Sequence, residues 1–373
     1  MKSRELLIRT INGEKVDRVA VAPFIYNNFI HEFYKSNEVD TVEKGIEVYK
    51  HFGFDIILRT CNVFDYLSET ACDSKNWRVT EQKKEEGRQW SVTTTIRTPE
   101  RELTQVKRYS KATEYETVEA VVEYYIKDEE DFLQFVKYQP PVPKYDCSVI
   151  AKARELLGED GLAAPWAQGA FNSVSFYRKL DDLIVDPFID PDFYREMMNY
   201  FSGRMFETIK QFAAAGADII CCGGNVGNAT MVGPVFFKEY VLPYEIEFTK
   251  KVKALGVYYL YHNCGDAALL LDYYPQIQMN IYETLTASPY GDTILEDALR
   301  KIDRNITLSG NIDQIEFLKT ASEEEVRQKV RNVLESAKTR GNFILAATDY
   351  FSEGTPYANI HAFAKAGMEF GRY

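Results

Sequence analysis

The stretch VYYLYHNCG, residues 257–265, is the part of the sequence that decides the predicted fold. It opens with a short β-branched and aromatic run, 257–262, and an amphipathic helical pattern precedes it at 234–255. Seven comparable runs lie elsewhere, at 19–25, 54–58, 162–166, 217–222, 279–283, 306–310 and 342–347. Further helical patterns cover 191–215 and 322–338, so strands and helices alternate as they do in a parallel sheet.

Eight strand runs predict a single α/β domain, residues 1–373, built as a (β/α)8 TIM barrel. A doubly wound open sheet is the alternative, but no Gly-rich dinucleotide-binding motif follows the first run. The spacing between the second and third runs is too long for a single crossover. Residues 65–150 are therefore predicted to be an insertion and a candidate lid, which contains a β-hairpin (90–97 with 102–108) and an acidic helix.

The composition limits where the protein works and what it binds. With 373 residues and 45% apolar content, the chain can bury a large core. No run approaches the roughly 18–20 apolar residues of a membrane span, and no signal-type segment follows the N-terminus, so a cytoplasmic protein without a membrane partner is expected. The six cysteines, of which Cys221 and Cys222 are adjacent, do not form a disulfide framework. A net charge of −12 with scattered basic residues disfavours a nucleic-acid partner.

Two metal-binding side chains follow one another at the end of the 257–262 run. His262 and Cys264 are two residues apart, and a strand directs residues i and i+2 to the same side. In a barrel that side is the mouth, where the active site lies. A neutral imidazole and a thiolate suit Zn²⁺, and Gly265 lets the chain turn away after the second ligand. A buried histidine beside a core cysteine is the alternative for this pair.

The next strand run ends in an acid, Glu283. Neighbouring barrel strands place their carboxyl ends within reach of one metal ion, so Glu283 is predicted as the third zinc ligand. A helix N-cap or a solvated loop acid is the alternative for this residue.

Several motifs resemble the uroporphyrinogen decarboxylase superfamily. They are RE at 4–5, INGEKVDRV at 11–19, GAD at 216–218, LPY at 242–244, HNCG at 262–265, SGNID at 309–313 and Gly354-Thr355-Pro356. The resemblance covers most of the chain outside 65–150 and is strongest after residue 205. It implies a (β/α) barrel, in agreement with the count of strand runs.

The superfamily contains both decarboxylases and zinc methyltransferases. The decarboxylases carry an Arg-rich segment after the first strand, whereas residues 23–29 here read PFIYNNF, so a polycarboxylate substrate would be poorly neutralised. The methyltransferases resemble this chain at His262 and Cys264, and the related cobalamin-independent methionine synthases have a glutamate at a place similar to Glu283. The resemblance therefore implies methyl transfer.

The fourth zinc ligand decides which methyl transfer is expected. Family members that activate a thiol bring a cysteine from the last strand, where this chain has none and Asp349 lies nearest. Cys222, at the end of the fourth run, is the alternative. A site with fewer thiolates makes zinc a stronger Lewis acid, which suits the departure of an oxygen in the demethylation of a methoxylated aromatic compound.

The methyl acceptor is expected to come from another protein. None of the four histidines lies in the Asp-x-His-x-x-Gly arrangement that ligates corrinoid cobalt, so a separate corrinoid protein is predicted to supply the cob(I)alamin that takes the methyl group. Three alternatives stay open: a methylcorrinoid:thiol methyltransferase, a uroporphyrinogen decarboxylase-like lyase, and a non-catalytic module that binds a corrinoid protein.

Residues near the predicted strand ends are candidates for binding the small methylated substrate. The aromatic candidates for the pocket walls are Tyr26, Phe29, Trp166 and Phe171. The candidates for orienting hydrogen bonds are Asn27, Asn225 and Asn311. For each aromatic residue, packing in the core is the alternative.

Overall fold

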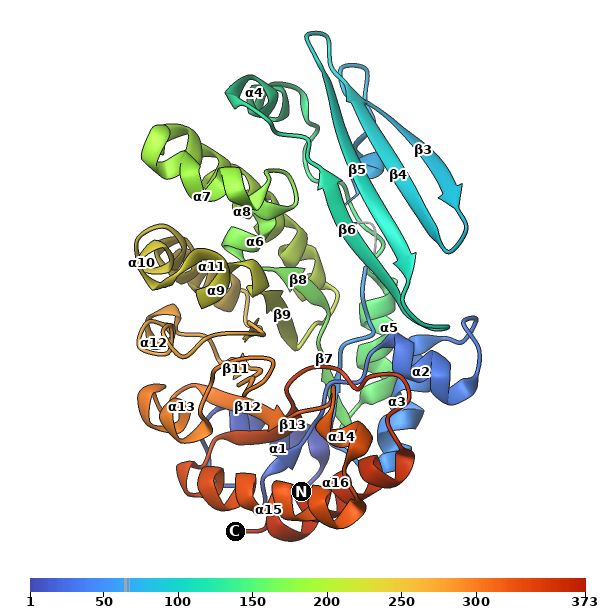
Figure 1. Ribbon diagram of the computed structural model, residues 1–373, viewed down its shortest axis with the longest axis vertical. Coiled ribbons are helices and arrows are strands. Elements are labelled where there is room, and N and C mark those ends of the chain that lie inside the picture. Colours follow the sequence, from blue (N-terminus) through green and yellow to red (C-terminus); the bar gives the residue numbers. More distant parts are fainter. Residues whose placement is uncertain (64–65, 67) are drawn as a thin grey trace.

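The centre of the molecule is a parallel sheet of seven strands (Figure 1). The computed structural model describes residues 1–63, 66 and 68–373. The strands, in spatial order, are β1 (Ala20–Val21), β13 (Phe343–Ala347), β12 (Thr307–Ile312), β11 (Ile281–Glu283), β10 (Tyr258–His262), β9 (Ile219–Gly223) and β8 (Trp166–Gln168). All neighbouring pairs are parallel, and the first strand of the chain pairs with the last.

A second parallel pair consists of β2 (Ile56–Leu58) and β7 (Gly161–Ala163). β7 leads into β8 after two residues, so this pair and the seven-stranded sheet share the segment 161–168. At the other edge of this pair, the N–H of Asp55, just before β2, donates a hydrogen bond to the carbonyl oxygen of Val21 in β1 at 2.9 Å. Each of the eight predicted runs overlaps a strand, which confirms the α/β class and the parallel sheet.

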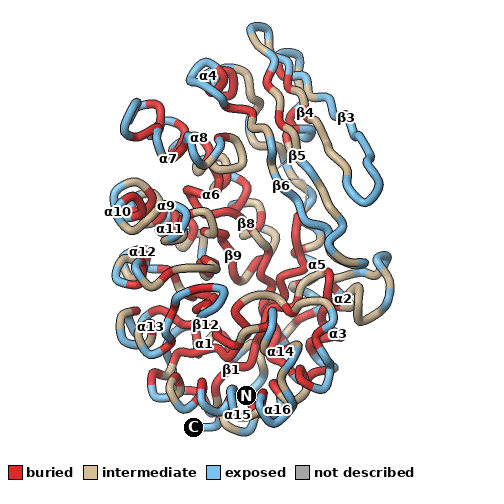
Figure 2. Tube along the Cα trace, in the orientation of Figure 1, coloured by how far each residue is buried: buried red, intermediate tan, exposed pale blue. Residues whose placement is uncertain are grey.

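Alternate residues of the parallel strands face two different surroundings. Leu260 and Cys221 belong to one apolar cluster together with side chains of α1 (Ser3–Ile11), whereas Tyr259, Tyr261 and Cys222 belong to the larger cluster formed with the surrounding helices. The buried positions follow the strands through the middle of the molecule (Figure 2). Strands buried on both faces explain why the sequence reads as continuous apolar runs there.

Helices connect the strands and cover their outer side. Their bounds are α2 (Asn27–Tyr34), α3 (Thr41–Phe52), α4 (Glu129–Tyr138), α5 (Ser148–Leu157), α6 (Ala170–Ser175), α7 (Leu180–Ile189), α8 (Pro191–Ala214), α9 (Ala229–Val232), α10 (Pro234–Phe236), α11 (Leu242–Lys253), α12 (Tyr274–Ile277), α13 (Leu295–Lys301), α14 (Phe317–Thr320), α15 (Glu323–Ala337) and α16 (Tyr357–Phe370). Short helical turns are η2 (Glu69–Cys72), η3 (Asn225–Gly227) and η5 (Lys338–Arg340).

Local sequence accounts for the ends of the longer helices. Asp190 accepts a hydrogen bond from Phe193 N–H at the start of α8, and α15 begins with a capping box of Ser322 and Glu325. The helix predicted at 234–255 is present but irregular. A π-helical turn, η4 (Phe237–Val241), separates α10 from α11. Pro243 lies just beyond this turn and has no N–H to donate, which is a physical reason for the break.

A four-stranded antiparallel sheet stands apart from the parallel strands at one end of the molecule (Figure 1). Its strands, in spatial order, are β3 (Arg78–Glu86), β4 (Gln89–Arg97), β5 (Glu102–Lys111) and β6 (Thr117–Glu123). The predicted hairpin is confirmed as β4 and β5, and α4 is the predicted acidic helix. β3 and β6 were not predicted, because their mostly exposed side chains give no alternating apolar pattern. The predicted start of the insertion, residue 65, lies outside the described residues.

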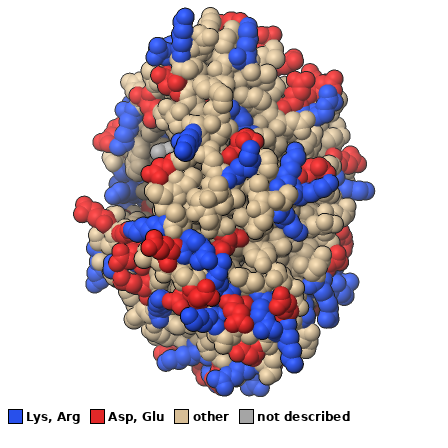
Figure 3. Space-filling view, turned by 180° about the vertical axis from the view of Figure 1, so that it is seen from behind, with Lys and Arg blue, Asp and Glu red and all other residues tan. Residues whose placement is uncertain are grey.

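The surface agrees with the charge pattern of the sequence. Lysine and arginine side chains alternate with acidic ones over the face shown in Figure 3, where no large area of positive charge gathers. Among the described residues, no helix is both long enough and apolar enough to span a membrane.

Candidate metal centre

The carboxyl ends of β10 and β11 bring two of the predicted residues side by side. His262 and Glu283 are partners in the parallel register of these strands. His262 lies two residues after Leu260, so its side chain is on the side of the sheet that Leu260 shares with α1. It is 2% exposed, and the chain leaves the strand at Asn263 and Cys264.

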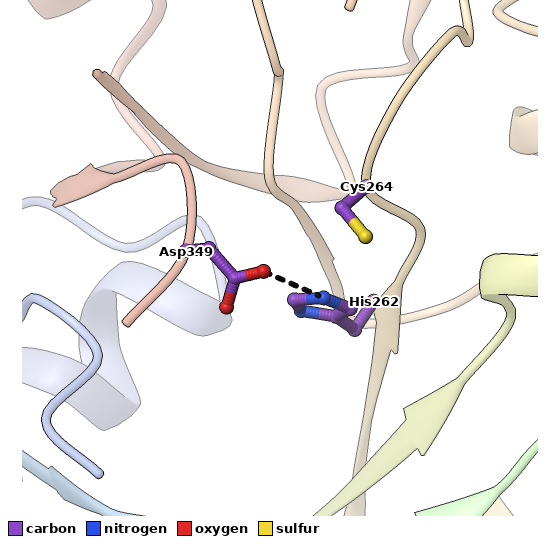
Figure 4. A group of neighbouring side chains, drawn as sticks. All are labelled: His262, Cys264 and Asp349. Atoms are coloured by element: carbon purple, nitrogen blue, oxygen red, sulfur yellow. Dashed lines mark ion pairs between the residues drawn. The ribbon is translucent and has the colours of Figure 1, made fainter. Parts of the chain in front are cut away.

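Three side chains point toward one another at this strand end: His262, Cys264 and Asp349 (Figure 4). Each offers one donor atom, and these atoms all lie within 4.8 Å of one another. The distance from His262 Nε2 to Asp349 Oδ2 is 3.8 Å. His262 is buried, whereas Cys264 and Asp349 are half-buried and therefore open to a ligand. One nitrogen, one sulfur and one oxygen donor at such spacing are a suitable set for zinc.

Glu283 has partners different from those expected of a third ligand. It lies 2.8 Å from His262 Nδ1, and Arg59 binds both of its carboxylate oxygens, with Nη2 to Oε2 at 2.5 Å. Arg59 is 1% exposed. Because both oxygens are already engaged, the geometry favours Glu283 as the group that orients His262 and leaves Nε2 facing the other donors.

Buried charges set the protonation of this cluster. Burial would raise the pKa of Glu283, but the neighbouring Arg59 charge and the His262 hydrogen bond lower it to about 2. Burial would lower the pKa of His262, but hydrogen bonds to Cys264 and Glu283 and the Asp349 charge raise it to about 10. Burial raises the pKa of Asp349. Without a metal the imidazole therefore holds a proton at neutral pH, and a metal ion must displace that proton to bind Nε2.

Cys222, the alternative fourth ligand, lies on the wrong side of its strand. It pairs in register with Tyr261 and packs in the helix-facing cluster with Tyr259. Burial raises the pKa of its thiol well above the usual value, and the nearby charge of Glu245 acts in the same direction. Of the two alternatives, only Asp349 reaches His262.

Aromatic side chains pack around the buried ring of His262. The Trp166 ring centroid lies 5.1 Å from that of His262, and Phe24 stacks on Trp166 at 5.8 Å. Tyr26 and Tyr350 pack against Phe24 at 5.5 and 5.7 Å. The structure thus places the predicted Trp166 beside His262 and the predicted Tyr26 beside Phe24, together with Tyr350; sequence analysis did not identify Phe24 or Tyr350.

The other two predicted aromatic residues lie elsewhere. Phe29 packs against Phe52 and Phe351, and Phe171 packs against Phe236, both in the helix-facing core. Their assignment to the pocket was wrong, because a buried aromatic residue at helical spacing serves the core as readily as a site.

Each of the three predicted asparagines lies at or after the end of a parallel strand and has a side-chain oxygen without a hydrogen-bond donor in the described part of the chain. Asn27 begins α2 after β1, Asn225 begins η3 after β9, and Asn311 lies near the end of β12. The side-chain oxygen of each is buried and has no hydrogen-bond partner among the described residues. These oxygens are candidates for holding a bound molecule or ordered water, and Asn311 lines a cavity together with Leu295 of α13 and Lys329 of α15.

Sequence analysis missed two polar residues that follow β2. Arg59 lies 4.4 Å from the centre of the Phe24 ring, in addition to its contact with Glu283. Asn62 accepts a hydrogen bond from Trp166 N–H at 2.8 Å and donates one to Arg59 O at 2.8 Å. The available signal was a charged residue placed directly after a buried strand run.

Comparisons with known proteins place these features in context. The family model described as uroporphyrinogen decarboxylase (URO-D) matches residues 116–370. No curated protein sequence matches the chain. A solved structure of a methyltransferase from Methanosarcina mazei is similar with a TM-score of 0.74 and 14% identity, over 99% of each chain. A D-psicose 3-epimerase from Clostridium cellulolyticum H10 is 13% identical over 59% of this chain and 80% of that one, with a TM-score of only 0.35.

Proposed function

Because this chain belongs to the uroporphyrinogen decarboxylase family, we propose that it is a zinc-dependent methyltransferase built on one (β/α)8 barrel domain, residues 1–373. The pairing of β1 with β13 and the hydrogen bond between Asp55 and Val21 support a closed barrel. The four-stranded sheet and α4 are then an insertion between the second and third barrel strands.

The observation that carries the proposal is the convergence of His262, Cys264 and Asp349. Their donor atoms approach within 4.8 Å at the carboxyl ends of parallel strands, where enzymes of this architecture place their sites. Glu283 fixes the ring of His262 from behind, as a carboxylate does for many zinc-bound histidines. The residues present therefore fit zinc, because they offer three protein donors, the number that catalytic zinc sites provide.

The donor set also indicates the direction of the chemistry. Asp349 contributes an oxygen where a thiol-activating site would have a second sulfur, so less negative charge is donated to the metal. When bound, zinc would act as a Lewis acid toward a departing oxygen, while the reduced corrinoid of a partner protein accepts the methyl group. The chain's own residues orient the substrate and keep water away. Trp166, Phe24, Tyr26 and Tyr350 supply the apolar walls for these tasks.

These walls suit a small methoxylated aromatic compound as the methyl donor. Aromatic rings stack favourably on aromatic side chains, and the unused oxygens of Asn27, Asn225 and Asn311 are available to a substrate hydroxyl. A decarboxylase acting on a polycarboxylate is less well supported, because Arg59 is already neutralised by Glu283. A cytoplasmic location and a separate corrinoid protein belong to the same proposal.

Metal analysis followed by a methyl-transfer assay tests this function. The purified protein should hold close to one zinc per chain, and His262→Ala or Cys264→Ala should remove most of it while the fold remains. The parent should demethylate 2-methoxyphenol in the presence of a reduced corrinoid protein. Transfer from methylcorrinoid to a small thiol, without ether demethylation, would favour the thiol methyltransferase. Absence of both metal and turnover would contradict the proposal and favour a binding module.

A further inference from the structure

The four-stranded sheet reaches the loop that carries a proposed metal ligand. Strands β5 and β6 are joined by residues 112–116, and the ends of these strands come down beside α2, near the loop that follows β13 (Figure 1). Glu116 in this turn accepts a hydrogen bond from Tyr350 Oη at 2.6 Å. Tyr350 is the residue after Asp349, so the sheet contacts the metal-binding loop directly.

A second contact joins the same turn to the same loop. Thr113 Oγ1 donates a hydrogen bond to the Glu353 carboxylate, and Tyr115 N–H donates to it at 3.4 Å. Glu32 of α2 also binds the loop by accepting a hydrogen bond from the Gly354 N–H at 2.8 Å. The loop is thus held at several points, but only the Glu116 contact acts on a side chain that faces the site.

Tyr350 connects the sheet to the aromatic side chains beside His262. Its ring packs edge-to-face on Phe24 with centroids 5.7 Å apart and lies 5.9 Å from Tyr26. Its backbone N–H donates to Asp349 Oδ1 at 2.8 Å. A change in the position of Tyr350 would therefore alter the aromatic packing around Phe24 and Tyr26 and disturb the hydrogen bond of Asp349.

We propose that Glu116 is a positioning residue that holds Tyr350 as a wall of the site, so that the four-stranded sheet limits the size of the molecule that reaches His262 and Cys264. A phenol donating to a carboxylate forms a charge-assisted hydrogen bond, which is strong enough to select one side-chain position. The substrate class in this inference rests on the proposed function, whereas the geometry can be tested without it.

Alkylation of Cys264 in the zinc-free protein tests the geometry alone. The rates with iodoacetamide and with the bulkier N-phenylmaleimide are compared by peptide mass spectrometry, and the half-buried Cys147 serves as an internal control. Removal of the hydrogen bond by Glu116→Ala or Tyr350→Phe should raise the bulky-to-small rate ratio at Cys264 by about tenfold. The double variant should show no further increase, because both changes remove the same bond.

Two matched variants separate positioning from general loosening. Glu116→Gln keeps a hydrogen-bond acceptor but not the charge, and its ratio should stay closer to that of the parent than the ratio of Glu116→Ala. Thr113→Val removes the neighbouring contact to Glu353 and should leave the ratio close to that of the parent. An unchanged ratio in both Glu116→Ala and Tyr350→Phe, or an equal increase in Thr113→Val, would overturn the inference.

Turnover of the zinc-loaded protein with a reduced corrinoid protein then tests the effect on specificity. In Glu116→Ala the ratio of kcat/KM for 3,4,5-trimethoxybenzoate to that for 2-methoxyphenol should rise about tenfold, mainly through KM. Unchanged ratios together with an unchanged alkylation pattern would overturn the role of Glu116. No turnover of either compound by the parent would contradict the proposed function instead, and the alkylation ratio would still decide the role of Glu116.

Discussion

Glu283→Gln tests whether Glu283 orients His262 or binds the metal. The substitution keeps the shape of the side chain but removes the charge that both oxygens present to Arg59. Arg59 is 1% exposed, so its guanidinium would remain buried without a counter-charge. Loss of one partner from a buried ion pair costs about 3–5 kcal/mol, and the free energy of unfolding of the metal-free protein should fall by that amount.

The same variant should weaken zinc binding without abolishing it. Loss of a carboxylate that orients a zinc-bound histidine reduces metal affinity by about 10–100-fold, whereas loss of a direct ligand removes most of the metal. Urea denaturation gives the stability, and competition with a chromophoric chelator gives the zinc affinity. Arg59→Met combined with Glu283→Gln should recover most of the stability, because the buried Arg59 charge is removed together with its counter-charge, but should not recover zinc affinity.

Asp186→Asn provides a matched control. Arg178 and Asp186 form another buried bidentate pair, with distances of 2.7 and 2.9 Å, on the helical side of the molecule. This change should lower stability by a similar amount and leave zinc affinity unaltered. The reasoning is refuted if Glu283→Gln loses zinc as completely as His262→Ala, since Glu283 would then be a ligand. It is also refuted if Glu283→Gln is as stable as the parent.

Three further predictions follow from the charges around His262. Because the pKa of His262 is raised to about 10, zinc binding must release the imidazole proton, and zinc affinity should rise by at least about tenfold per pH unit near neutrality. A flat profile in chelator competition would contradict this. The pKa of His262 in the folded protein lies above the usual 6.5, so its charge stabilises the metal-free protein fully below about pH 6.5. This contribution is lost as the pH rises through about 10. The difference in urea midpoint between the parent and His262→Ala should therefore shrink over that range. Asp349→Cys should maintain or increase zinc affinity and reduce ether demethylation, and a variant that demethylates as fast as the parent would show that the ligand-charge argument is wrong.

Most of the parallel sheet was predictable because buried strands consist of runs of apolar residues. Strands such as β9 and β10 are covered on both faces, so nearly every residue is apolar. The four-stranded antiparallel sheet was harder to predict, because some of its strands are mostly exposed. β3 is exposed along almost its whole length and reads as a charged segment, although nine of its residues pair with β4. Backbone pairing of this kind depends on a neighbouring strand and leaves little trace in the side chains.

Only those residues of the site that lie close together in the sequence could be predicted to act together. The i, i+2 spacing of His262 and Cys264 at a strand end predicted that their side chains lie on one side, and the two donor atoms do lie close together although Cys264 is two residues beyond the end of β10. The role of Glu283 depends instead on Arg59, which lies 224 positions away in the chain and reaches the same strand end through the fold. A strand-end acid near a metal site becomes a ligand or a support according to whether a buried cation already binds its oxygens. Asp349 uses Oδ1 to accept the Tyr350 N–H and directs Oδ2 toward His262 Nε2, so its second oxygen is the one left available for metal.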